Sequence, residues 1–131
     1  MKRTDAREMI MQLIFQMEAQ KDFSSEARIT YRENNFDGTD QEAYFDKIMD
    51  TFLENRTAID AQIEEASNKW HLGRMGKVDL AVLRVALTEL RLKDDIPQSV
   101  AINEAVNMAK KFGSEESGKF VNGLLGNIVK A

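Results

Sequence analysis

The chain has 131 residues, of which 43% are hydrophobic, and this is enough for one domain with its own core. It contains no cysteine, which excludes disulfides, a thiolate nucleophile and a cysteine metal site. No apolar run approaches the ~20 residues of a membrane span, and no apolar stretch follows the charged N-terminus as in a secretory signal. These features predict a single cytoplasmic domain over residues 1–131.

Charge is unevenly distributed along the chain. The formal net charge is −4, but residues 1–65 carry −7 and residues 66–131 carry +3. The acidic surplus lies mainly between Glu33 and Glu65, whereas the positive groups lie at the N-terminus and in the second half. Such an asymmetry can orient a polyanion toward one face of a domain.

Apolar residues recur with helical spacing and no segment alternates like a strand, so the chain is predicted to be all-α. The first predicted helix runs from Asp5 to Gln20, and Asp5 and Glu8 have the spacing of a capping box. Its core-facing stripe consists of Ala6, Ile10, Leu13 and Met17. Phe15 falls off that stripe, and such an aromatic either fills a second part of the core or faces a partner.

The next predicted helix, from Ser25 to Glu33, has a weak pattern and leads into a loop that contains Gly38. A second capping box, from Thr39 to Glu42, opens an acidic amphipathic helix. Its apolar residues are Phe45, Ile48, Phe52 and Leu53. The run from Asn55 to Thr57 indicates a break or bend, which places Ile59 and Ile63 on a further helix toward Trp70.

The segment from Lys77 to Leu92 is apolar nearly all round, which is typical of a buried central helix. Its polar exceptions are Arg84, Thr88 and Arg91, whose spacing puts them on one narrow strip. Asp94, Asp95 and Pro97 are predicted to end the helix.

Two helices are predicted to close the chain, and Gly113 is the expected stop of the first. The first is predicted to bury Ile102, Ala105, Val106, Ala109 and Phe112, and the second Val121, Leu124, Leu125 and Ile128. Their junction gathers Lys110, Lys111, Lys119 and Phe120. Cations beside an aromatic suit a nucleic-acid backbone and an unstacked base. A helical hairpin with solvated lysines is the alternative interpretation.

The sequence contains no recognisable active site. The run from Gly113 to Lys119 fits seven positions of a P-loop, but Phe120 stands where Ser or Thr must reach magnesium, and a helix precedes the run. His71 is the only histidine and has no evident fellow metal ligands. We therefore expect a binding function with no catalytic residue, metal or cofactor.

The chain resembles the NusB family of bacterial transcription antitermination factors. The resemblance is carried by Ala6-Arg-Glu8, the run from Val78 to Leu90, the run from Val100 to Val106 with Ala109-Lys110, and Lys119-Phe-Val-Asn-Gly-Leu124. It implies a compact fold of about six to seven helices in two small bundles and no enzymatic activity. It also implies binding to boxA-type single-stranded RNA together with the ribosomal protein NusE, within the RNA polymerase antitermination complex that supports processive rRNA transcription.

The resemblance assigns roles to individual residues. Lys2, Arg3, Arg7, Lys119 and Phe120 match RNA-contacting positions, and Glu116 matches an acidic position that modulates RNA binding. Thr4 and Asp5 stand where the family often has further arginines, which weakens the attraction for RNA. Phe15 and Asp79 match the NusE-facing surface.

Four alternatives remain open at this point. Asp79 sits where it can simply complement the positive end of its own helix. Asn103 and Glu104, in the strongly matched run, can tie helices together. The whole protein can also be a helical adaptor for protein partners only, or a homodimer whose interface covers the RNA surface.

Overall fold

The computed structural model describes residues 1–67 and 72–130, and within these ranges the chain is all-α with no strand. The elements are α1 (Arg3–Gln20), α2 (Ser25–Asn35), α3 (Glu42–Ala66), the 3-10 turn η1 (Leu72–Arg74), α4 (Lys77–Leu90), α5 (Gln98–Phe112) and α6 (Glu115–Lys130). None of these helices is both long and apolar enough to cross a membrane. The all-α prediction is confirmed.

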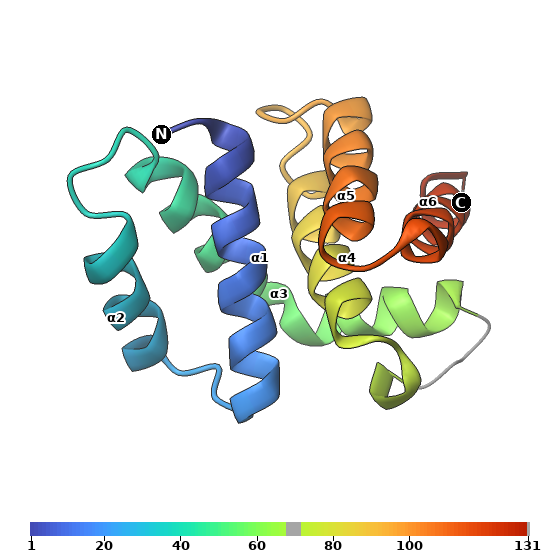
Figure 1. Ribbon diagram of the computed structural model, residues 1–131, viewed down its shortest axis with the longest axis horizontal. Helices are drawn as coiled ribbons and strands as arrows, with labels where there is room; N and C mark the ends of the chain where they lie inside the picture. Colours follow the sequence, from blue (N-terminus) through green and yellow to red (C-terminus); the bar gives the residue numbers. More distant parts are fainter. Residues whose placement is uncertain (68–71, 131) are drawn as a thin grey trace.

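The helices form two groups that share α3 (Figure 1). The blue helix α1 stands near the middle, with α2 and the first half of α3 on one side and α4, α5 and α6 on the other. The long helix α3 runs behind both groups in this view and packs against α4 and α6. The two small bundles implied by the family resemblance are therefore present.

Helix α4 is the centre of the core, as its apolar sequence predicts. Every residue from Leu80 to Glu89 is buried, because α1, α3, α5 and α6 all pack around this helix. The predicted stripe of α1 is buried as well, and the buried apolar residues of both groups form one continuous cluster. Burial of this apolar surface is the main force that holds the helices together.

A buried ion pair ties α1 to α4 and α5. The Arg7 guanidinium on α1 is 2% exposed and donates to the two carboxylate oxygens of Glu89 on α4, each at 2.9 Å. It also lies 3.2 Å from Glu104 on α5, and Tyr44 on α3 donates its hydroxyl to Glu89 at 3.0 Å. Burial by itself would lower the pKa of Arg7, but the hydrogen bond to Glu89 and the nearby acidic charges raise it. The Arg7 guanidinium therefore stays charged.

A second buried arginine ties α4 to the other two long helices. Arg84 donates to both carboxylate oxygens of Asp60 on α3 at 2.9 Å and to Glu18 on α1 at 2.8 Å. Burial by itself would raise the pKa of Glu18, but hydrogen bonds from Lys21 and Arg84 lower it below the ordinary value. Two members of the predicted polar strip, Arg84 and Thr88, are thus buried within the core, while Arg91 is exposed.

Three local expectations are corrected by the structure. Helix α3 continues through Asn55, whose amide donates to the Thr51 carbonyl at 2.7 Å, so the predicted break is absent. Helix α1 begins at Arg3 after Lys2, with no side-chain cap from Asp5. Helix α3 begins at Glu42 after Gln41 with no side-chain cap, and the Glu42 carboxylate instead accepts from the Gly38 N–H at 2.7 Å. The expectations for Trp70 and His71 lie outside the described residues.

Candidate functional site

The hairpin of α5 and α6 is built around two glycines. Helix α5 ends at Phe112, and Gly113 follows as predicted. A Cβ on Gly113 would lie 2.6 Å from the Ser117 hydroxyl oxygen and 2.8 Å from the Ala109 carbonyl, so this tight turn excludes a side chain. On α6, Gly118 is buried under the aliphatic stem of Lys110, 2.7 Å from where its Cβ would be. The two helices consequently lie side by side with Lys110 across them.

Lys119 and Phe120 project from the first turns of α6. The Lys119 side chain is 75% exposed, and its ammonium lies 3.6 Å from the Glu116 carboxylate, one turn earlier on the same helix. Phe120 is half-buried, whereas Val121 is fully buried, because neighbouring helical positions point about 100° apart. Lys119 and Phe120 thus meet solvent at one place, as the sequence predicts.

A hollow of about 470 Å³ lies beside Phe120, between α6 and the end of α3. Its lining residues are Ala66, Ser67, Lys119, Phe120, Gly123, Leu124 and Asn127. The described residues of its lining supply an aromatic ring, an ammonium group and an amide, and none of them has a carboxylate. A Cβ added to Gly123 would meet no atom within 4 Å, so this glycine leaves open space at the rim. This chemistry suits an unstacked base next to a phosphate.

Lys111 does not belong to this cluster. Its ammonium contacts both carboxylate oxygens of Glu8 on α1, at 2.9 and 3.1 Å. The predicted junction of four residues is therefore divided: Lys119 and Phe120 lie on α6, Lys110 of α5 lies across Gly118 of α6, and Lys111 is paired with the first helix. The adjacent lysines point apart because they differ by one helical position.

The basic residues at the N-terminus differ in their exposure and in their contacts. Lys2 is exposed. Arg3 is exposed but donates to Gln41 at 2.7 Å, with its guanidinium 4.0 Å from the centre of the Tyr44 ring. Arg7 is buried against Glu89, which corrects the expectation that it offers a charge to RNA. A sequence pattern did not reveal this burial because the partner carboxylate lies 82 positions away.

The two residues assigned to a protein partner differ in exposure. Phe15 is 38% exposed on α1, as its off-stripe position indicates. Asp79 stands in the first turn of α4 and is half-buried, which corrects the expectation of an exposed carboxylate. Among the described residues, nothing hydrogen-bonds the buried Oδ1 atom of Asp79. Because this oxygen is buried, a donor from outside the chain does not reach it in this structure.

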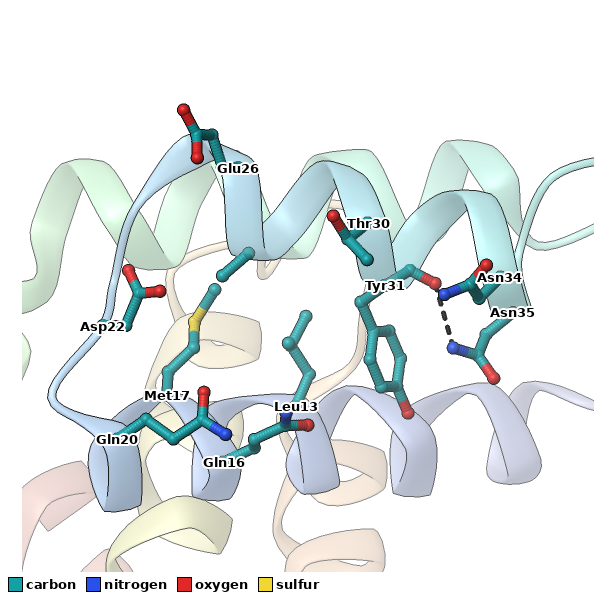
Figure 2. Close-up of a pocket in the computed structure, with 11 residues that line it drawn as sticks. Leu13, Gln16, Met17, Gln20, Asp22, Glu26, Thr30, Tyr31, Asn34 and Asn35 are labelled. Atoms are coloured by element: carbon teal, nitrogen blue, oxygen red, sulfur yellow. Dashed lines mark hydrogen bonds between the residues drawn. The ribbon is translucent and has the colours of Figure 1, made fainter.

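A second groove, which the sequence analysis did not single out, lies between α1 and α2 and has a volume of about 460 Å³. Figure 2 shows side chains from both helices along it, with Leu13 and Met17 at its base. Its polar lining includes four amide side chains, Gln16, Gln20, Asn34 and Asn35, and two carboxylates, Asp22 and Glu26. The described lining has two carboxylates and neither Lys nor Arg, so this groove disfavours a polyanion.

No three His, Asp or Glu side chains in the described ranges gather closely enough to hold a metal ion. What the structure assembles instead is a cationic and aromatic surface on α6. This surface is suited to contact with an anionic ligand that carries flat, unsaturated rings.

Comparison with known proteins supports a definite relationship. A family model described as the NusB family matches residues 4–130. The transcription antitermination protein NusB of Acetivibrio thermocellus is 47% identical over 99% of this chain and 90% of its own length.

Solved structures agree with the sequence comparison. A structure of T. maritima NusB superposes with a TM-score of 0.87 at 35% identity, covering 99% of this chain and 92% of that one. A chain from a complex of the antitermination factors NusB and NusE with double-stranded RNA superposes with a TM-score of 0.84 at 27% identity, covering 98% and 96%. The match extends over nearly the whole chain at the level of sequence and fold, and the chain belongs to the NusB family.

Proposed function

We propose that this protein is a transcription antitermination factor that binds boxA-type single-stranded RNA together with NusE, in the bacterial cytoplasm and without catalysis or a cofactor. The observation that carries the proposal is the placement of Lys119 and Phe120 at the hollow between α6 and α3. Family membership and the solved complex of a relative with NusE and RNA support it.

Phe120 is the proposed stacking platform and Lys119 the proposed phosphate contact. Stacking of one base on an aromatic side chain contributes roughly 1–3 kcal/mol. The exposed residues Lys2 and Arg3 add positive charge at the N-terminal end of α1. Arg7 is left out of this surface because its guanidinium is buried. With so few free cations, we expect RNA binding to be salt-sensitive but with a shallow slope.

NusE is proposed to bind at the surface that contains Phe15 and Asp79. An exposed aromatic side chain is a frequent anchor in protein interfaces. The Asp79 carboxylate places a negative charge in the first turn of α4, and this charge would speed association with a basic ribosomal protein. Asp79→Asn should therefore slow NusE association with little change in melting temperature. A lower melting temperature with unchanged NusE binding would assign Asp79 to the helix end alone.

The decisive experiment titrates labelled boxA-type RNA with the protein, with and without NusE, at several salt concentrations. We expect binding that is strengthened by NusE and a slope of log affinity against log salt of about −2 to −3, for three or four phosphate contacts at roughly −0.7 each. Absence of binding in both conditions at low salt would reject the RNA function and favour an adaptor for proteins only.

A further inference from the structure

Another polar groove, separate from the α1–α2 groove, lies between α5 and α6. It is on the other side of Lys119 from the Phe120 hollow. Its volume is about 450 Å³. The residues that line it are Asn103, Val106, Asn107, Lys110, Gly118, Lys119 and Asn122. Lys119 is shared by both depressions, so the groove and the hollow meet at this residue.

The groove follows from helical spacing on both of its walls. Asn103, Asn107 and Lys110 recur at intervals of four and three residues, which puts them on one face of α5. Lys119 and Asn122 are three residues apart on α6. Gly118 completes this wall without a side chain, and the Lys110 stem occupies the place where its Cβ would be. The glycine therefore determines where the Lys110 side chain lies.

The lining has a consistent chemical character. Its described residues supply two ammonium groups and three amides, and none of them has a carboxylate. Within the described residues, Lys110 forms no ion pair, and Lys119 has only the exposed Glu116 nearby, at 3.6 Å. Ammonium groups and amide N–H groups both donate to phosphate oxygens, and an amide can also accept from a ribose 2′-hydroxyl. A free anion would contact only the two lysine ammonium groups. A ribose–phosphate chain would contact the lysines through its phosphates and the amides through its phosphates and 2′-hydroxyls.

We propose that the α5–α6 groove holds the sugar–phosphate backbone of the nucleotides next to the base at Phe120. This inference rests on the proposed RNA function and adds a second contact region to it. Lys110 and Lys119 neutralise phosphates, and Asn103, Asn107 and Asn122 contact phosphates or 2′-hydroxyls. RNA then crosses α6 at Lys119, with a base on the α3 side and its backbone on the α5 side.

The test compares Lys110→Gln with Lys111→Gln, in the presence of NusE and boxA-type RNA. The two lysines are adjacent and lose the same charge, but Lys111 is paired with Glu8 outside the groove. Lys110→Gln should make the salt slope shallower by about 0.7 and lower affinity about fivefold at ~0.1 M salt, as expected for one lost phosphate contact. Lys111→Gln should leave both quantities unchanged.

Two further variants probe the groove without changing its charge. Asn107→Ala should reduce RNA affinity with an unchanged salt slope, and should reduce the preference for RNA over DNA of the same sequence if the amide contacts a 2′-hydroxyl. Gly118→Ala should displace the Lys110 stem, which lies 2.7 Å from the position of the added Cβ, and should lower RNA affinity. Melting curves of all the variants establish that each is folded.

The outcomes separate this inference from the proposed function. Equal losses in Lys110→Gln and Lys111→Gln would indicate a diffuse charge effect and overturn the groove. Unchanged affinity in Lys110→Gln and Asn107→Ala, with a loss in Phe120→Ala, would also overturn the groove while leaving the RNA function intact. If the unmodified protein with NusE binds no RNA, both proposals fail together.

Discussion

The α1–α2 groove and the α5–α6 groove are alike in size and in amide content but opposite in charge. Their volumes are about 460 and 450 Å³, and each is lined by several amide side chains. The first adds Asp22 and Glu26, and the second adds Lys110 and Lys119. Amides can contact almost any polar ligand, so the charged residues decide which of the two grooves accepts a polyanion.

The two grooves also differ in how their outer helix is held. No residue of α2 is fully buried, and this helix is attached by the partly buried Ala27 and Tyr31 and by polar contacts such as the hydroxyl of Tyr31 donating to the Met9 carbonyl at 2.9 Å. Helix α6 instead buries Gly118, Val121, Leu124 and Leu125. We therefore expect α2, the outer wall of the acidic groove, to open more easily than α6, the outer wall of the basic groove.

The largest expected effect comes from removing the buried Arg7–Glu89 ion pair. This pair ties α1, a wall of the acidic groove, to the helices that pack with α5, a wall of the basic groove. Arg7→Ala would leave the Glu89 carboxylate buried without its partner, and breaking such a pair costs about 3–5 kcal/mol. Urea denaturation should show this loss, whereas Arg3→Ala at an exposed site should cost far less. If Arg7→Ala lowers the free energy of unfolding only as much as Arg3→Ala, other groups satisfy Glu89 and Arg7 does not hold α1 against α4.

The next largest effect separates binding from stability on α6. Phe120→Ala should weaken RNA binding by roughly 1–3 kcal/mol, the value of one stacked base, and should leave the domain folded. Val121→Ala should instead lower the free energy of unfolding by about 2 kcal/mol, because Val121 is fully buried, and should spare RNA affinity. Binding titrations and thermal melts measure both effects. If Phe120→Ala unfolds the protein, Phe120 is a core residue.

Lowering the pH should weaken the attachment of α2 more than that of α6. The hydrogen bond from Arg32 is the main cause that holds the pKa of Asp46 below its ordinary value of 3.8. The resulting stabilisation is complete above that value and is lost as the pH falls through the lower pKa of the folded state. Amide exchange should therefore show α2 losing protection before α6 as the solution is acidified.

Asp46→Asn serves as the control for this acid effect. It removes the titrating carboxylate that contacts Arg28 and Arg32, so α2 should be less protected at neutral pH, and its protection should depend less on acid. If α6 loses protection at a higher pH than α2 does, the idea that surface ion pairs hold α2 and not α6 is wrong.

The smallest expected effect tests whether charge acts locally. Glu116→Gln removes the carboxylate 3.6 Å from Lys119 and should raise RNA affinity by less than about fivefold, as befits an exposed ion pair. Glu26→Gln makes the same change of charge in the α1–α2 groove and should leave RNA affinity unchanged. Equal gains in the two variants, measured by the same titration, would show that net charge matters more than the site.

The sequence by itself determined the features that depend on neighbours within a few turns. Helical spacing was enough to predict the all-α fold, the buried stripe of α1 from Ala6 to Met17 and the central position of α4. It also predicted that Val121 is buried while Lys119 meets solvent. These properties follow from the 3.6-residue period of a helix, which assigns each side chain to a face before any tertiary contact forms.

Only the tertiary structure decided which charges are free. Arg7 and Lys111 are ordinary cations in the sequence, yet one is buried against Glu89, 82 positions away, and the other is paired with Glu8, 103 positions away. The α5–α6 groove likewise requires two helices to meet at Gly118. Ion pairs and grooves join residues that are distant in the chain, and no local period encodes the packing that brings them together.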